Sequence, residues 1–124
     1  MKKKNNKFSI KSRIKSFDYA FQGILFFIKT QHNARIHLLM AIVVVVFGFI
    51  YELCITEWCL IIFAIGMVFS TEIINTALEY VSDLVSPEKN LKVKRIKDLA
   101  AGGVLISAIT AAIIGLIIFI PKIF

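Results

Sequence analysis

The sequence has little of what marks a disulfide-rich or metal-binding domain. Cysteine and proline each occur only twice in 124 residues. Cys54 and Cys59 fit neither a CxxC pair nor a zinc spacing, which argues against a disulfide framework and a cysteine-based metal site. The pattern also shows no internal repeat, no Gly-rich nucleotide loop and no signal peptide. The length is enough for one domain, which we take as residues 1–124.

Apolar residues, by contrast, are abundant and gather in runs. They make up 58% of the chain, and the mean hydropathy is +0.80, whereas soluble domains are about 45–50% apolar. Stretches 36–51, 58–71 and 99–121 carry no Asp, Glu, Lys or Arg. A membrane span needs about 20 apolar residues, so the first two need a partly polar turn, tilt or protein neighbours. The sequence therefore predicts an all-α integral membrane protein with transmembrane helices at 36–51, 58–85 and 99–121.

The charges are distributed unevenly along the chain. Seven basic residues precede Asp18, five more lie in 86–97, and the 52–57 loop carries two glutamates and no base. By the positive-inside rule, the N-terminus and an 86–97 loop face the cytoplasm, and the 52–57 loop lies outside. The net charge of +7 then meets lipid headgroups or a polyanionic ligand. Nucleic acid is not expected, because no recognition motif accompanies the charge.

The N-terminal region predicts a helix that lies on the membrane. Residues 1–7 form a basic tail, and 8–30 carry apolar residues at helical spacing. Tyr19 falls nearly opposite this apolar stripe. A basic amphipathic helix of this kind lies in the interfacial plane. The stripe consists of Ile10, Ile14, Phe17, Phe21, Ile24, Leu25 and Ile28.

A polar stripe interrupts the second span. Glu72, Asn75, Glu79 and Asp83 fall within an arc of about 80° on a helix. This stripe runs from mid-membrane at Glu72 to the cytoplasmic surface at Asp83. A carboxylate inside a membrane is costly and marks a functional site by default. Three spans are too few to enclose the stripe, which suggests an oligomer with sites between helices.

The residue types in this stripe suit phosphoryl transfer. Mg²⁺ typically takes one or two carboxylates and completes its shell with phosphate oxygens and water. A second carboxylate, deeper in the bilayer, suits a general base. Lys97 and Asp98, at the start of the third span, could meet nucleotide phosphates. The composition therefore permits a site for a phosphorylated cytosolic ligand and a lipid-borne substrate.

Two motifs resemble those of a known family. "ExxNTALExxxD" at 72–83 and "KDLAAG" at 97–102 are similar to the signature of the small prokaryotic diacylglycerol kinases, which include undecaprenol kinases. The resemblance extends over nearly the whole chain. The "RIH" at 35–37 and the closing "IIGLIIFIPK" at 113–122 are more similar to the undecaprenol kinase branch. The resemblance implies a homotrimer in the cytoplasmic (inner) membrane that transfers the γ-phosphate of MgATP to a lipid hydroxyl, of undecaprenol or diacylglycerol.

The resemblance also implies roles for individual residues. Glu72 matches the catalytic base, Glu79 a ligand of both metal and nucleotide, and Asn75 the amide that supports this constellation. Other matching positions imply ATP contacts at Tyr19, Glu88, Asn90, Lys97 and Asp98, and further polar site residues at Arg35 and Asp83.

Gln31 departs from the family pattern. Much of the family has a glutamate there, which shares the metal with the residue at position 79. Glutamine offers a carbonyl oxygen but no negative charge. Two other functions stay open at this point. A small proton-coupled transporter would use Glu72 but leave Lys97 and Asp98 without a role, and a non-catalytic membrane subunit would explain Gln31.

Overall fold

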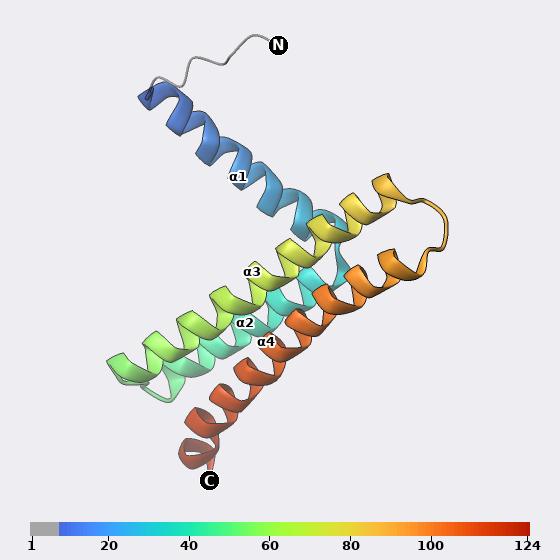
Figure 1. Cartoon of the computed structure of the whole chain (residues 1–124). Helices are drawn as coiled ribbons and strands as arrows, with labels where there is room; N and C mark the ends of the chain where they lie inside the picture. The colour runs from blue at the N-terminus through green and yellow to red at the C-terminus, as the bar shows by residue number, and fades with distance from the viewer. Residues whose placement is uncertain (1–7) are drawn as a thin grey trace.

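A computed structural model of the chain describes residues 8–124, so the predicted basic tail at 1–7 lies outside the described residues. Within 8–124 the chain forms four α-helices and no strands (Figure 1). They are α1 (Ile10–Thr30), α2 (His32–Ile50), α3 (Ile55–Val85) and α4 (Leu91–Ile123). The prediction of an all-α fold is confirmed.

Side chains near three helix starts satisfy backbone N–H groups that would otherwise lack partners. The hydroxyl of Ser9 accepts from the N–H of Ser12 at 3.3 Å, at the start of α1. Glu57 in the first turn of α3 accepts from the N–H of Cys54 at 3.0 Å. Asn90 accepts from the N–H of Lys92 at 2.8 Å, at the start of α4. These caps position the helix boundaries locally.

The loop predicted at 86–97 is wrong in its extent. Only residues 86–90 connect α3 to α4, and the basic cluster that follows lies on the first turns of α4. The physical reason is the Asn90 cap together with Leu, Lys, Arg and Val, which continue a helix without a break. At 33 residues α4 is about 50 Å long, so it extends well beyond a hydrocarbon core of about 30 Å.

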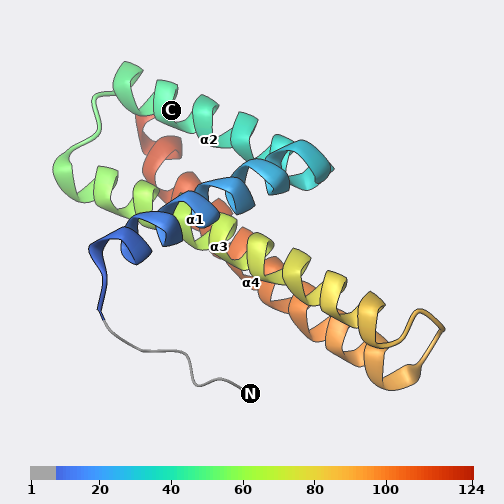
Figure 2. The same ribbon diagram turned by 90° about the horizontal axis from the view of Figure 1, so that it is seen from above.

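Helices α2, α3 and α4 are each long and apolar enough to cross a membrane. Antiparallel helices α3 and α4 pack side by side over much of their length (Figures 1 and 2). A small core at the α2–α3 turn contains Leu53, Ile61, Ile118 and Phe119. There Gly48 lies under the Trp58 ring, where an added Cβ would be 2.6 Å from Cη2. The absent side chain lets α2 and α3 approach closely.

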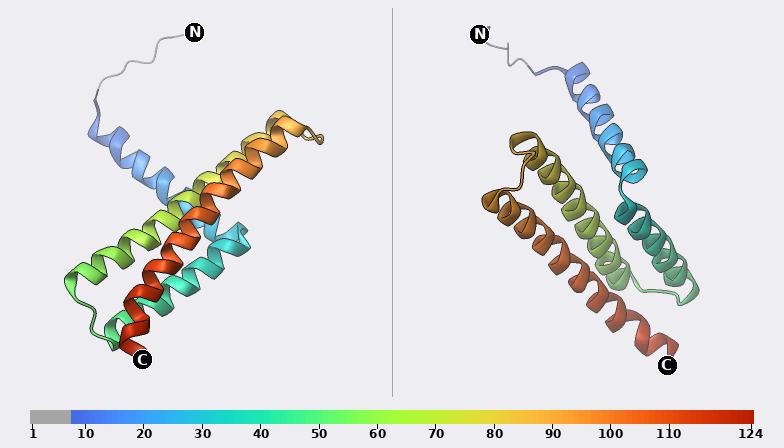
Figure 3. Two further views of the ribbon diagram at one scale, coloured as in Figure 1. Left: turned by 60° about the horizontal axis from the view of Figure 1, so that its bottom comes forward. Right: turned by 90° about the vertical axis from the view of Figure 1, so that its right-hand side faces the viewer.

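Helix α1 runs at a steep angle to α3 and α4 (Figure 1 and Figure 3, left). Its contact with the other helices uses Phe27, which is buried, and Phe26, whose ring lies 5.8 Å from that of Tyr80. The predicted apolar stripe from Ile10 to Leu25 stays exposed. Most side chains of the three spans are also exposed in the single chain. Apolar surface of this extent is typical of a multi-pass membrane protein.

Candidate active site

Glu72 lies in the interior of α3 and is the most deeply buried charged side chain among residues 8–124, at 4% exposure. Its Oε1 lies 2.9 Å from Nε2 of His37 on α2. The His37 ring is half-buried and meets Phe69 edge-on, with centroids 6.5 Å apart. A buried carboxylate requires such a partner, because desolvation would otherwise be very costly. The two helices thus share a polar contact inside an apolar surrounding.

Our site predictions did not include His37. It lies in the first apolar span, 35 residues from Glu72. Two features of the sequence could have indicated His37 as a site residue. It belongs to the "RIH" motif, and its polar ring stands at the start of an apolar run. Which carboxylate it meets follows from the packing of α2 on α3 alone.

Asn75 follows Glu72 by one helical turn. Its Oδ1 is buried and has no hydrogen-bond partner in the described part of the chain. The adjacent Thr76 is satisfied, because its hydroxyl donates to the backbone carbonyl of Glu72 at 2.9 Å. A buried acceptor without a donor costs about 1–3 kcal/mol. Asn75 therefore presents an oxygen that a ligand, metal-bound water or neighbouring chain could use.

No hydrogen bond joins the two predicted metal ligands, Glu79 and Gln31, within the described residues. Glu79 is exposed on α3 and makes no hydrogen bond or ion pair within 8–124. Gln31 occupies the extended residue between α1 and α2, and its Nε2 donates to the Thr30 hydroxyl at 3.4 Å. No group of three or more His, Cys, Asp or Glu side chains gathers among the described residues. The metal role of both stays a prediction.

The turn between α3 and α4 brings together four of the predicted site residues. Asp83, Glu88, Asn90 and Lys97 line one open pocket at this end of the helix pair. Lys97 Nζ lies 2.7 Å from Oδ1 of Asp83. The Asn90 side chain also caps α4, so any contact with a nucleotide would be in addition to that structural role.

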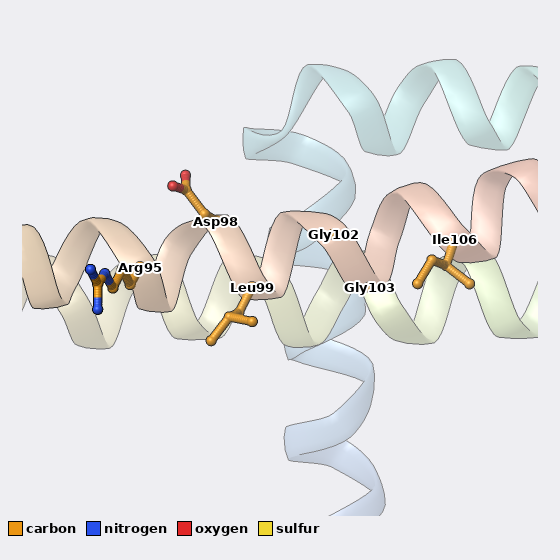
Figure 4. Close-up of a pocket in the computed structure, with 6 residues that line it drawn as sticks. All are labelled: Arg95, Asp98, Leu99, Gly102, Gly103 and Ile106. Carbon is orange, nitrogen blue, oxygen red and sulfur yellow. The ribbon is translucent and has the colours of Figure 1, made fainter.

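Asp98 lies one residue further along α4 but faces a different surface. Its Oδ2 lies 2.6 Å from Nζ of Lys94. It also borders a shallow groove with Arg95, Leu99 and the pair Gly102 and Gly103. Figure 4 shows Asp98 projecting from the opposite side of α4 to Leu99. Within one chain, Asp98 and Lys97 are thus not directed into the same pocket.

Two further predicted site residues, Tyr19 and Arg35, form no hydrogen bond or ion pair with Glu72 among the described residues. Tyr19 on α1 is 66% exposed. Arg35 on α2 is exposed and forms no ion pair with any residue in the described range. Their predicted roles would require a ligand or a second chain.

These features define a helical, multi-pass membrane protein with a buried carboxylate in the interior of one span. The family model described as prokaryotic diacylglycerol kinase matches residues 18–119, which is most of the chain. The chain therefore belongs to the prokaryotic diacylglycerol kinase family, and the predicted resemblance is confirmed. Its enzyme class is that of the lipid kinases.

Two relatives are named for lipid kinase activity. The chain is 39% identical over 122 residues to a protein of Bacillus subtilis (strain 168) named "Undecaprenol kinase", covering 98% of this chain and 99% of the relative. It is 35% identical over 107 residues to a "Diacylglycerol kinase" of Synechocystis sp., covering 86% of this chain and 61% of the relative.

Proposed function

We propose that this protein transfers the γ-phosphate of MgATP to the hydroxyl of a membrane polyprenol such as undecaprenol. The near full-length similarity to a protein named undecaprenol kinase supports this substrate over diacylglycerol. The observation that carries the proposed chemistry is the buried Glu72 carboxylate, held at Oε1 by His37. Among the described residues nothing is hydrogen-bonded to its Oε2.

Glu72 acts as the general base in this proposal. Its carboxylate accepts the proton of the lipid hydroxyl as the hydroxyl oxygen bonds to the γ-phosphorus of ATP. The bond from that phosphorus to the β–γ bridging oxygen breaks, and ADP leaves. A base must lie within hydrogen-bond reach of the proton that it takes. The open Oε2 supports this role.

The length of α3 supports a position of Glu72 that the hydroxyl of the lipid substrate can reach from the cytoplasmic side of the membrane. At the other end of α3, Lys122 lies 3.2 Å from Glu57, and Trp58 is the next residue along the chain. Charged residues beside a tryptophan are typical of a membrane interface. About 20 helical residues cross the hydrocarbon core, so counting from Trp58 the core ends near residue 78. Glu72 then lies roughly 9 Å inside that boundary, shallower than the mid-membrane depth expected from the sequence. A lipid hydroxyl anchored at the headgroups can reach that depth.

The pocket at the α3–α4 turn supports a nucleotide site on the same side. Lys97 supplies a cation for phosphate oxygens, and the basic first turns of α4 add positive potential. Asp98, Glu88, Asn90 and Tyr19 are the further ATP contacts of this proposal. With this side cytoplasmic, the N-terminus and the site both face the cytoplasm across an inner membrane.

The donor atoms present fit Mg²⁺ in part. Glu79 supplies a carboxylate, while Asn75 and Gln31 supply neutral oxygens. Hard oxygen donors suit Mg²⁺, which completes its shell with phosphate and water, and the orphaned Oδ1 of Asn75 is one such donor. When bound, the ion neutralises phosphate charge. The chain itself contributes the positions of these oxygens on α3 and at the α1–α2 junction.

We propose that the protein works as a homotrimer with α1 on the membrane surface. Glu79 is exposed in the single chain at the edge of the hydrocarbon core, and the buried Oδ1 of Asn75, one turn deeper on α3, has no partner among the described residues. A neighbouring chain would cover Glu79 and bring Tyr19, Arg35 and Asp98 toward the site. The uncovered stripe of α1 would rest in the lipid interface.

The experiment uses the purified protein, radiolabelled ATP and a panel of lipid alcohols that includes undecaprenol and diacylglycerol. We expect Mg²⁺-dependent labelling of undecaprenol with a higher kcat/KM than that of diacylglycerol. A higher kcat/KM for diacylglycerol would contradict the proposed substrate but still support the proposed lipid kinase reaction. Lipid-independent proton uptake into vesicles, with no labelled lipid, would instead indicate a proton-coupled transporter. Absence of both activities would indicate a non-catalytic subunit.

A further inference from the structure

The contact between His37 and Glu72 is the only side-chain hydrogen bond that joins α2 to α3 in the region 8–124. We propose that His37 is a positioning residue, which holds Oε1 of Glu72 so that Oε2 faces the lipid hydroxyl. This inference rests on the proposed function, in which Glu72 is the base. His37 itself touches neither lipid nor nucleotide in this proposal.

The hydrogen-bond chemistry assigns the direction of the contact. A general base must be ionised, and an ionised carboxylate only accepts hydrogen bonds, so in this proposal the Nε2 of His37 carries the hydrogen and donates. The distance of 2.9 Å is that of a normal N–H···O bond. The carboxylate is then anchored at one oxygen and free at the other. An unanchored glutamate has three rotatable torsions and would sample several rotamers.

The surroundings of His37 hold the ring in turn. Ala34, one turn earlier on α2, is fully buried at 0% exposure, so the α2 backbone lies close to its neighbours at this point. Phe69, on α3, meets the ring edge-on. The His37 side chain is 26% exposed, against 6% for that of Glu72. The His37 ring therefore packs against α3, and it is the more exposed partner of the His37–Glu72 pair.

Positioning has a large effect on transfer rates. A displacement of about 1 Å at a reacting group can cost roughly 100-fold in rate. Losing the His37 hydrogen bond leaves the Glu72 torsions free, which lowers the fraction of molecules ready to react. Substrate affinity is set elsewhere, at the α3–α4 turn and on the lipid-facing surface. The effect should therefore appear in kcat and leave KM nearly unchanged.

The test compares His37→Leu with His37→Gln in the full-length protein, using undecaprenol and MgATP. We expect His37→Leu to lower kcat by about 10- to 100-fold, with both KM values within about twofold of wild type. His37→Gln should restore most of the loss, because the Gln side-chain amide can place a donor near the position of Nε2. A His37→Leu kcat equal to wild type, or no rescue by Gln, would overturn the proposal.

A matched control removes a different polar contact between helices. Lys122→Leu breaks the 3.2 Å contact between α4 and Glu57 at the other end of α3. It should lower thermal stability less than His37→Leu does, because both of its partners are about a quarter exposed whereas Glu72 is buried, and it should leave kcat unchanged. If Lys122→Leu lowers kcat equally, the His37 effect is general loosening of the helices, and the proposal fails.

Two more measurements separate positioning from stability and from the proposed function. In a Glu72→Gln background, His37→Leu should lower kcat no further, because residues that act as a unit are not additive. Carbodiimide labelling of Glu72, read by mass spectrometry, should be faster in His37→Leu and near wild type in His37→Gln. Labelling needs no kinase activity. A wild-type protein without kinase activity would thus contradict the proposed function. A labelling rate in His37→Leu equal to that of the wild type would instead contradict the positioning role of His37.

Discussion

Lys97 on α4 and Asp83 on α3 form a 2.7 Å ion pair that bridges the turn between the two helices. Their side chains are 38% and 68% exposed, respectively. Exposed pairs of this kind contribute about 0–1 kcal/mol to stability. The pair therefore does little to hold α3 against α4, which pack along their length in any case. The pair instead positions the ammonium group of Lys97 at the edge of the pocket proposed for the nucleotide.

Lys97→Met should weaken MgATP binding. A hydrogen bond to a charged group is worth about 1.5–3 kcal/mol, so the KM for MgATP should rise roughly 10- to 100-fold. The control is Lys92→Met, which removes the same charge from the same helix outside the pocket. Steady-state kinetics with varied MgATP measure both. Equal KM values for the two variants would mean that Lys97 acts only through general charge.

Glu72→Gln should abolish transfer while leaving MgATP binding intact. Glutamine keeps the size and can still accept from His37, but it does not take a proton from the lipid. Positioned bases contribute about 10²–10⁴-fold, so kcat should fall by that factor. Radiolabelled lipid product and equilibrium binding of MgATP give the two readouts. Retention of more than about a tenth of wild-type turnover would contradict the assignment of the base.

Gln31→Glu should tighten the dependence on Mg²⁺. A carboxylate binds Mg²⁺ more strongly than a neutral carbonyl, so half-maximal activity should require less Mg²⁺. If residue 31 lies near Glu79 in the assembled site, the added charge should also lower thermal stability without Mg²⁺. Mg²⁺ titrations of activity and of Tm test both effects, with Gln22→Glu as a control on exposed α1. An unchanged Mg²⁺ requirement would show that Gln31 is not at the metal.

Gly48→Val should destabilise the α2–α3 turn. A Cβ at this position would lie 2.6 Å from Trp58 Cη2 and 3.1 Å from Leu53 Cδ1. Overpacking of this kind costs about 1–3 kcal/mol, so the Tm in detergent should fall. Gly23→Val is the matched control, because nothing lies within 4 Å of its Cβ position. An equal Tm for both variants would mean that the Trp58 ring moves aside freely.

Individual residues show how far sequence patterns reach. The polar stripe grouped Glu72 with Asn75, and both lie on α3, because neighbours on one helix face follow from spacing alone. Their shared place at the start of the third span grouped Lys97 with Asp98, yet the two side chains line different pockets. Adjacent residues on a helix are about 100° apart, so only one of them can face the α3–α4 turn. The partner of each then depends on the rotation of α4 about its axis.

The sequence by itself determined that the chain is helical, membrane-spanning and a member of its family. Those properties depend on local apolar runs, whose length must match the bilayer, and on short motifs within single helices. Only the tertiary structure decided which residues meet across helices. His37 contacts Glu72, Phe26 rather than the amphipathic stripe meets Tyr80, and Lys97 pairs with Asp83. Such contacts depend on how helices rotate and cross when they pack, and that geometry is set by many side chains together.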